Sequence, residues 1–245
     1  MVFMVRLAFD LRQRYSRSNS KLKSMNLDTK LLAALASGVA TCASPAITII
    51  ADAADAQARS TSTTGQATVS TFFAGTYYNA GPGLVPVFPF QLPTLAAGES
   101  FDTATLTLEL TSLFGSTPTF NGDIVGLDRI ASAPTVLGVD WGGAGTILED
   151  NFYTPSSTAS IGTTIDFASW MNTQYDGGAN AGEYVFIRVD AEGSTSGRSA
   201  YVVASADNAT AQVPTIDYTV AAIPEPTSAS LLGLGCLALA LRRRK

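Results

Sequence analysis

The stretch FDTATLTLELTSL, residues 101–113, alternates apolar and polar side chains along most of its length. Leu106, Leu108 and Leu110 fall on one side of the alternation, and threonines fall on the other. Successive side chains of a β-strand point to opposite faces, whereas a helical face repeats about every 3.6 residues. The pattern therefore predicts an antiparallel strand with one buried face and one solvated face.

Similar short runs of β-forming residues lie on both sides of this stretch. They cover residues 68–73, 84–91, 123–130, 146–153, 161–167, 184–190, 200–206 and 215–221. Clusters of Gly, Pro, Asn and Asp separate them, as at 79–83 and 176–180. One short helix is expected at 167–174, with Asp166 as its N-cap. Many short strands with such punctuation predict an all-β fold, a single antiparallel β-sandwich of the jelly-roll type over residues 59–222.

The charges of the chain are segregated. Residues 1–58 carry seven Lys or Arg and the last four residues carry four more, whereas residues 59–222 hold four Arg against fifteen Asp and Glu. This middle part has a net charge of −11 and should repel nucleic acid, so no nucleic-acid partner is expected. With about 160 residues, it is long enough to form one domain with a substantial core.

The middle part also lacks residues that many catalytic sites need. It contains no His and no Cys, because Cys42 and Cys236 lie in the two end segments. This composition excludes Ser-His-Asp and Cys-His catalysis and histidine-based transition-metal sites. The remaining material for glycoside hydrolysis consists of Asp123, Asp128, Asp140, Glu149 and Asp150. Because Glu149 and Asp150 are adjacent, they would point to opposite faces of a strand, and we expect no enzymatic activity.

The N-terminal segment, residues 1–58, is expected to be a basic extension followed by a secretory signal peptide. Lys30 precedes a long, mostly small and apolar stretch. Ala56-Gln57-Ala58 fits the small-x-small pattern of a signal-peptide cleavage site. Cleavage after Ala58 is therefore expected, with cleavage after Ala54 or Ala56 as alternatives.

The C-terminal segment, residues 223–245, has the sequence IPEPTSASLLGLGCLALALRRRK. Pro224, Glu225 and Pro226 cannot enter a regular helix or a central strand, so an extended and exposed peptide is expected there. The uncharged run that follows is expected to form a transmembrane helix of about 22 Å, short of the roughly 30 Å hydrocarbon core. The basic end predicts a cytoplasmic C-terminus, with the chain before Pro224 on the outer side of the membrane.

The order Pro-Glu-Pro, short apolar helix and terminal arginine cluster resembles the PEP-CTERM sorting tail of Gram-negative and related bacteria, also called an ice-binding-protein C-terminal motif. The matching residues are Pro224, Glu225, Pro226, Arg242, Arg243 and Arg244. The resemblance implies a partner, an exosortase, which is a membrane transpeptidase that cuts at the tail and passes the protein outward. It also implies that the tail holds the protein in the membrane before processing. The isoleucine before the first proline and the short helix depart from the family pattern.

A second resemblance covers most of residues 66–220. The segment VFPFQLPTLAAGESFDTATLTLEL, residues 87–110, is similar to the opening of DNRLRE-type jelly rolls, which resemble carbohydrate-binding modules. Further matching positions are Ala104, Leu106, Leu108, Asp166, Trp170, Tyr201, Ser205, Asp207, Pro214, Ile216 and Tyr218. The usual arginine of that family before the closing proline is Val213 here. The resemblance implies a single jelly-roll domain and binding of polysaccharide.

A calcium site is one candidate ligand site. Asp176, Asn180 and Glu183 lie in a Gly-rich loop and offer the hard oxygen ligands that calcium prefers. The same residues also suit a plain hairpin loop, because Asp, Asn and Gly favour turns. No other cofactor is expected.

Aromatic side chains are the second candidate, because a ring can pack against the apolar face of a sugar. Trp141, which precedes two glycines, and Tyr175 are the expected ligand-binding residues, with Tyr77 and Tyr78 as further candidates, whereas Trp170 is expected in the core. The sequence as a whole predicts an exported, non-enzymatic protein of the cell surface or the extracellular polysaccharide matrix. The alternative is a carbohydrate-binding module that acts on extracellular polysaccharide, and a surface hydrolase is a more distant third.

Overall fold

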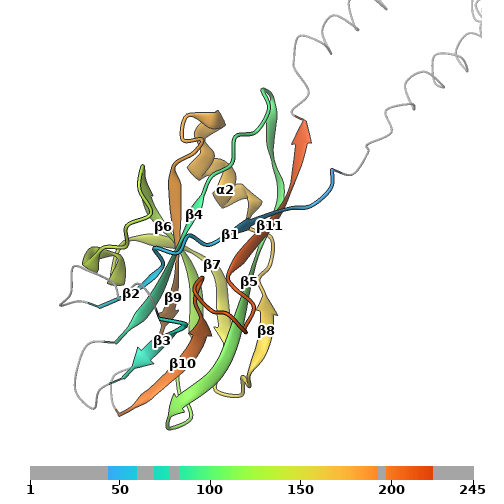
Figure 1. Cartoon of the computed structure of the whole chain (residues 1–245). Helices are drawn as coiled ribbons and strands as arrows, with labels where there is room; N and C mark the ends of the chain where they lie inside the picture. The colour runs from blue at the N-terminus through green and yellow to red at the C-terminus, as the bar shows by residue number, and fades with distance from the viewer. Residues whose placement is uncertain (1–43, 60–68, 78–82, 193–196, 223–245) are drawn as a thin grey trace, which may run out of the picture. The chain divides into compact units, whose positions relative to one another are not determined.

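The computed structural model describes residues 44–59, 69–77, 83–192 and 197–222 (Figure 1). These residues form two antiparallel sheets. Sheet A consists of β1 (Ile47–Ile50), β3 (Thr71–Thr76), β5 (Glu99–Gly115), β8 (Ser160–Thr163), β10 (Ser199–Ala204) and β11 (Thr215–Ala222). Sheet B consists of β2 (Ala56–Ala58), β4 (Val85–Gln91), β6 (Gly122–Ala131), β7 (Gly145–Tyr153) and β9 (Tyr184–Ala191). The expectation of an all-β fold is confirmed.

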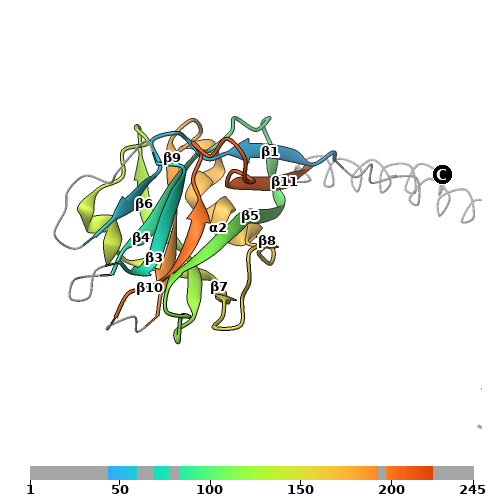
Figure 2. The same ribbon diagram turned by 60° about the horizontal axis from the view of Figure 1, so that its bottom comes forward.

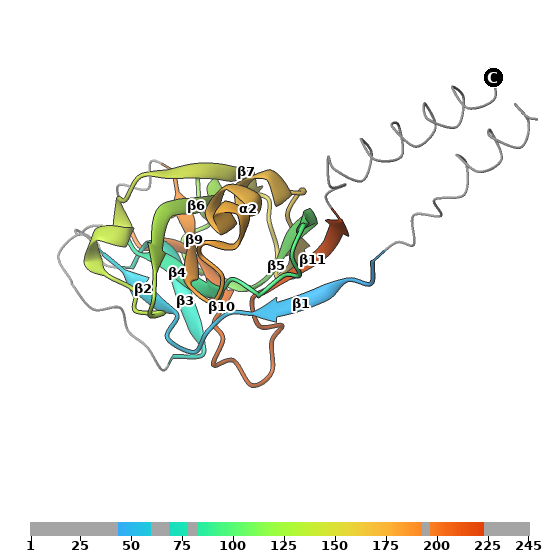
Figure 3. The same cartoon turned by 90° about the horizontal axis from the view of Figure 1, so that it is seen from above.

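The nine predicted strands correspond to β3 through β11. The structure adds β1 and β2, which lie in the segment expected to be a signal peptide, and the short 3-10 helix η1 (Gly138–Trp141). The expected helix is present as α2 (Ala168–Tyr175), and a 3-10 turn, η2 (Asp176–Gly178), follows it. Figure 3 looks at the end of the sheets where α2 lies.

The predicted N-cap of this helix is wrong by one residue. Phe167 holds the cap position and provides no side-chain hydrogen bond. The Asp166 carboxylate instead accepts hydrogen bonds from the backbone N–H groups of Ala168 and Ala104, each at 2.9 Å. Asp166 therefore ties the start of α2 to β5 rather than capping the helix alone.

Strand β5 organises sheet A because it is long enough to pair with three others. Thr107 pairs with β8 on one side and with β11 on the other, and Leu110 pairs with β8 and with β10. Strands β10 and β11 therefore lie end to end along the same edge of β5, and the loop 205–214 leaves the sheet between them (Figure 2). Strands β3 and β1 follow in the same way, paired with β10 and β11 respectively.

The main core lies between the facing sides of the two sheets. Leu106, Leu108 and Leu110 are fully buried there, as the alternation predicts, with Phe88 and Phe90 of sheet B in the same cluster. Trp170 of α2 also belongs to this core. Its indole lies over Gly126 of β6, where an added Cβ would come within 2.4 Å of the ring, so only glycine leaves room for it.

A second apolar cluster lies on the outer side of sheet B. Its members are Ala56, Ala58, Val85, Val87, Val125, Leu127, Val136 and Phe186. Val85 and Val87 alternate with Phe88 and Phe90 of the main core, which places the two clusters on opposite faces of β4. The Arg129 guanidinium covers the ring of Phe186 at 3.6 Å from the ring centroid.

Within the ranges that the structure describes, no helix is long and apolar enough to cross a membrane. The expected transmembrane helix, Pro224, Glu225, Pro226 and the terminal arginines all fall in residues 223–245, outside the described part of the chain.

Candidate functional site

The predicted calcium ligands lie in the turn after α2. Asp176 takes a left-handed backbone conformation at φ 45° and is exposed. The Asn180 side chain donates to the carbonyl of Gln174 at 2.9 Å, and the backbone N–H of Glu183 donates to the carbonyl of Asn180. Among the described residues, no contact joins the three side chains to one another. The left-handed backbone of Asp176 and the local hydrogen bonds of Asn180 and Glu183 are those of a turn, and calcium binding by these residues stays a prediction.

An acidic cluster forms elsewhere, at one end of β6, β7 and β9. Carboxylate oxygens of Asp123, Asp150 and Glu192 lie within 4.8 Å of one another. Asp123 is buried, whereas Asp150 and Glu192 are exposed. The backbone N–H of Asn151 donates to Asp123 at 2.8 Å. Asn151 has a φ of 58°, a conformation that asparagine tolerates better than most residues.

The pKa of Asp123 is raised, chiefly because burial disfavours its charged form. The hydrogen bond from Asn151 acts in the opposite direction, and the charges of Glu192 and Asp150 raise the pKa further. A proton or a cation with a preference for oxygen ligands, such as calcium, would relieve this repulsion. The sequence indicated Asp123 and Asp150 as separate acidic residues, but it gave no reason to join them with Glu192.

Other acidic residues have structural partners. Asp140 accepts a hydrogen bond from the Arg129 guanidinium at 2.8 Å, and Glu149 accepts one from the backbone N–H of Ile165 at 2.8 Å. Glu149 and Asp150 lie on β7 but only Asp150 belongs to the acidic cluster. The two adjacent residues therefore have different partners, and the absence of catalysis stays a prediction.

Tyr175 is a core residue, so its predicted role in sugar binding is wrong. It is 5% exposed, and its hydroxyl accepts a hydrogen bond from the backbone N–H of Leu95 at 3.0 Å. Its ring meets Phe101 edge-on, with centroids 5.6 Å apart. A ring held in this way has no free face for a ligand. The cause is the packing of α2 against β5, which turns this position inward.

Trp141 is half-buried at the end of η1 and packs against the outer cluster of sheet B. Its indole N–H donates to the carbonyl of Gly83 at 2.7 Å. Trp170 is 8% exposed, which confirms the expectation that it belongs to the core. Ala56 and Ala58, the residues expected at the cleavage site, lie in β2 and are buried members of the same outer cluster.

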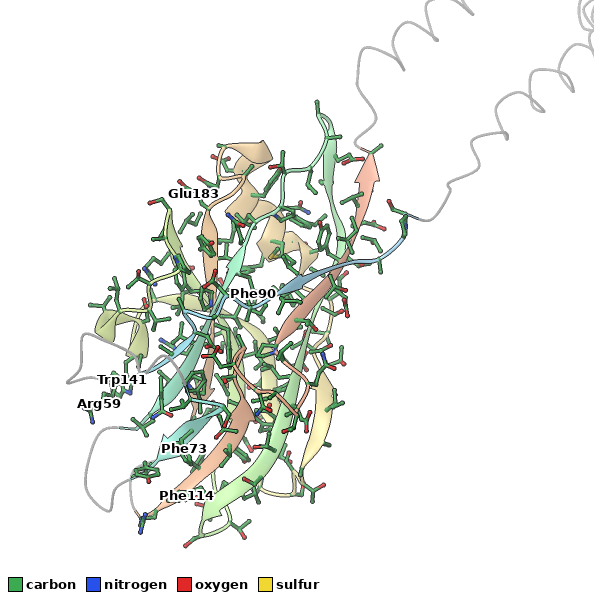
Figure 4. All side chains as sticks on the ribbon, in the orientation of Figure 1. Arg59, Phe73, Phe90, Phe114, Trp141 and Glu183 are labelled. Carbon is green, nitrogen blue, oxygen red and sulfur yellow. The ribbon has the colours of Figure 1, made fainter. Side chains whose placement is uncertain are left out.

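An aromatic cluster lies on the outer face of sheet A and contains Tyr77, one of the candidate ligand-binding residues, with two rings that the sequence did not indicate. The other candidate, Tyr78, lies outside the described residues. Phe73, Tyr77 and Phe114 are half-buried. The ring centroid of Tyr77 lies 4.8 Å from that of Phe73 and 4.8 Å from that of Phe114, and the centroids of Phe73 and Phe114 are 5.1 Å apart. The Arg198 guanidinium lies 5.1 Å from the Phe114 ring centroid and 5.8 Å from that of Tyr77. Figure 4 shows Phe73 and Phe114 close together, at the end of the molecule opposite to Glu183.

Strand register explains why these rings meet. Phe73 of β3 and Ser112 of β5 both pair with Val202 of β10, so β10 lies between the strands that carry the rings. Tyr201, which precedes Val202 on β10, points into the main core. Side chains alternate along a strand, so Val202 and Phe73 point outward.

A polar hollow adjoins the aromatic cluster on the same face. It has a volume of about 430 Å³ and lies where the loop 205–214 leaves the sheet. Its lining residues are Ser70, Thr71, Glu109, Thr111, Asn208, Ala209, Thr210 and Ala211. Thr71 lies two positions before Phe73 on β3, so hydroxyl groups and rings follow each other along one surface.

No protein-family model matches the chain, and no curated protein matches it at a significant level. The geometry of the described residues therefore carries the functional argument together with the sequence of the two ends. Two surface features of the described residues could bind a ligand. One is the acidic cluster, and the other is the outer face of sheet A with its aromatic rings, hydroxyl groups and the Arg198 guanidinium.

Proposed function

We propose that the chain is an exported, non-enzymatic protein of the cell surface or extracellular matrix, sorted through its C-terminal tail by an exosortase. The order Pro-Glu-Pro, apolar run and arginine cluster within residues 223–245 carries this proposal. The tail holds the protein in the membrane until it is processed. The acidic middle, free of His and Cys, supports an extracellular role without catalysis.

We also propose that the domain is a jelly roll. Sheet A contains the neighbours β3, β10, β5 and β8, and sheet B contains β4, β9, β6 and β7. Strands that follow one another in the chain mostly alternate between these two sheets, as in a double Greek key. This order supports the fold that the resemblance to carbohydrate-binding modules implies.

The positions of the two ends suit a protein that is tethered at one pole. Ile47 of β1 pairs with Tyr218 of β11, so the described chain begins and ends on the same side of the domain. Ala222 pairs with Glu99, whereas Phe114 lies fifteen positions further along β5. At about 3.3 Å per residue, the aromatic cluster lies up to about 50 Å from the point where the tail begins.

The sorting proposal is tested in a bacterium that encodes an exosortase. The full chain and a variant with Pro224→Ala, Glu225→Ala and Pro226→Ala are compared by cell fractionation and mass spectrometry. We expect the unaltered chain to lose Arg242 to Lys245 and to leave the membrane fraction, and the variant to stay there whole. A chain with Thr227→Ala and Ser228→Ala is the matched control and should be processed normally. Identical processing of both variants would refute recognition of the Pro-Glu-Pro element.

A second candidate function, binding of extracellular polysaccharide, is favoured by the outer face of sheet A. Aromatic rings pack against the apolar faces of sugars, and the neighbouring Ser, Thr and Asn side chains can hydrogen-bond sugar hydroxyls. The Arg198 guanidinium adds a donor group that would suit an acidic sugar. The three rings beside the polar hollow form the single observation that carries this candidate.

A glycan array and polysaccharide pull-down with the full chain test this candidate. Phe114→Ala and Arg198→Ala should each lower binding at least about tenfold, because a lost stacking contact or charge-assisted hydrogen bond costs about 1.4 kcal/mol or more. Ile165→Ala is the control, because Ile165 is a large apolar residue at the surface that lies beyond β8, away from the aromatic cluster. Absence of binding to every glycan would remove this candidate and leave a structural role.

A further inference from the structure

Strand β1 is part of sheet A, and strand β2 is part of sheet B. The four residues of β1 pair with β11 from Ile47–Tyr218 to Ile50–Thr215. The three residues of β2 pair with β4, from Ala56–Val87 to Ala58–Val85. The chain therefore crosses from sheet A to sheet B between residues 50 and 56. Both strands lie before Arg59, in the stretch where the sequence predicts a signal peptide.

The crossing itself is anchored by hydrogen bonds to distant parts of the chain. The backbone N–H of Ala51 donates to Pro214 at 3.0 Å, and that of Asp52 donates to Pro89 at 2.8 Å. The Asp55 carboxylate accepts from the backbone N–H of Ala206 at 2.6 Å. These bonds reach the loop 205–214 and β4, so the crossing holds elements of both sheets.

Strand β2 also contributes to the neighbouring strand and to a core. The Gln57 side-chain carbonyl accepts a hydrogen bond from the backbone N–H of Phe73 in β3, at 2.8 Å. Ala56 and Ala58 are 3% and 1% exposed and pack with Val85 and Val87 in the outer cluster of sheet B. A larger side chain would not fit where these alanines lie without displacing that cluster.

Cleavage after Ala58 would remove all of these groups. It would leave the N–H and C=O groups along one edge of β11 and β4 without their strand partners, and it would uncover Val85 and Val87. Unpaired edges with apolar side chains promote aggregation, and buried backbone groups without partners are costly. Signal peptidase cuts an unfolded chain, so the burial of Ala58 does not block the cut. The cost falls on the domain that folds afterwards.

We propose that residues 47–58 are the first two strands of the mature domain, and that signal-peptide cleavage occurs at or before Ala46. Ser44-Pro45-Ala46 is itself a small-x-small sequence, and it lies just before β1 in chain without regular secondary structure, with Pro45 and Ala46 exposed. This inference rests on the proposed export of the protein. It replaces the cleavage site expected from Ala56 and Ala58.

The N-terminus of the exported protein tests the inference directly. The full chain is produced in a Gram-negative host, and the exported form is analysed by intact mass and N-terminal peptide sequencing. We expect a first residue at or before Ile47. A first residue at Arg59, or at any position after Ile50, would overturn the inference. A chain that stays uncut in the cytoplasm would refute the proposed export. In that case the melting experiment described next tests whether residues 47–58 belong to the fold.

The second measurement compares two variants of the full chain that carry the same chemical change. Ala56→Asp places a carboxylate in the buried cluster, and Ala53→Asp places one at an exposed position three residues earlier. If residues 47–58 belong to the fold, Ala56→Asp should lower Tm by roughly 10 °C or more and Ala53→Asp should leave it nearly unchanged. Equal melting of both variants and the unaltered protein would overturn the inference, whether or not the chain is exported.

Discussion

Asp140 and Asp55 are both buried carboxylates, but Asp140 lies beside a cation whereas Asp55 lies near other acidic residues. Asp140 lies in η1 on the outer side of sheet B, and Asp55 lies in the crossing from β1 to β2. Asp140 accepts hydrogen bonds from the Arg129 guanidinium and from the backbone N–H of Leu137, at 2.8 Å and 2.7 Å. Asp55 has one backbone donor, Ala206, and its second oxygen has no partner among the described residues.

The charges around the two carboxylates explain the difference. The pKa of Asp55 is raised to about 7, chiefly because burial disfavours the charged form. The hydrogen bond from Ala206 acts in the opposite direction, and the charges of Asp207 and Asp52 contribute to the rise. Asp140 has a cation in contact instead. Residues 59–222 contain only four Arg, and two of them, Arg129 and Arg188, lie in the η1 region. The fold therefore buries one carboxylate beside its scarce cations and the other among further acids.

The largest expected effect comes from removing the buried carboxylate of Asp140, which pairs with the half-buried Arg129. Asp140→Ala leaves Arg129 without its ion pair. It also removes the hydrogen bond from Leu137 that closes the η1 turn, and two carbonyls of this turn accept hydrogen bonds from Arg188. Breaking one partner of a fully buried pair typically costs about 3–5 kcal/mol. Because Arg129 is partly exposed, we expect a loss in the free energy of unfolding at the lower end of that range. Urea denaturation measures it.

Asp128→Ala is the control for this comparison. Asp128 lies next to Arg129 on β6 but is exposed, so its removal should change the free energy of unfolding by no more than about 0.5 kcal/mol. If the two variants lost the same stability, the ion pair at Asp140 would not be the feature that stabilises this region.

The second prediction concerns pH and Asp55. The unfolded chain releases this proton near the ordinary value of 3.8, whereas the folded chain holds it up to about pH 7. The folded state thus binds more protons within this window, so the contribution of Asp55 is complete below about pH 4 and is lost as the pH rises to about 7. Asp55→Asn removes this dependence and should make the protein more stable than wild type at pH 8, by about 3 kcal/mol.

Urea midpoints of wild type and Asp55→Asn, measured from pH 4 to pH 8, check this prediction. The difference between the two proteins should grow with pH and level off above about pH 7. Asp52→Asn is a useful companion, because Asp52 is only half-buried and its loss relieves part of the repulsion. A difference that stays constant with pH would show that Asp55 does not titrate in this window.

Much of the fold could be predicted because its strands carry their own pattern. The alternation around Leu106 and Leu108 and the glycine-rich turns between runs were enough to place β3 through β11 and α2. Strands β1 and β2 were not predictable from sequence because an apolar run such as Ile47 to Ile50 suits both a signal peptide and a strand. Only the pairing with β11 and β4 separates these readings, and that pairing joins residues far apart in the chain.

The candidate sites were harder to predict for the same reason. The rings of Phe73 and Phe114 meet because β10, far along the chain, lies between their strands. The carboxylates of Asp123, Asp150 and Glu192 come from three separate strands or strand ends. Tyr175 was expected to bind a ligand because an aromatic ring can pack against a sugar, but helix α2 directs this ring into the core. The residue types indicated which kinds of ligand could bind. The pairing of distant strands determined which of these residues lie next to one another.

The smallest expected effect tests Asp123, whose surroundings are intermediate between those of Asp140 and Asp55. Asp123 is buried like both, but the acids beside it are exposed to water, which screens their charge. Asp150→Asn removes one of these charges, and the amide oxygen that replaces the carboxylate can keep the hydrogen bond from the Asn151 side chain. The pKa of Asp123 should fall toward its ordinary value. We expect a gain of about 0.5 kcal/mol in the free energy of unfolding at pH 7 and low salt.

Salt and calcium distinguish the causes of this gain. In high salt the gain should shrink, because screening removes the repulsion in both proteins. Asp128→Asn changes an exposed residue of β6, the strand that also carries Asp123, and should show little gain under either condition. Millimolar calcium chloride provides the decisive comparison. If repulsion among the carboxylates is all that matters, calcium acts like any other salt and wild type never exceeds the variant. If the three carboxylates hold the ion, wild type is stabilised by ligand binding and overtakes Asp150→Asn, so the order of the two melting temperatures reverses.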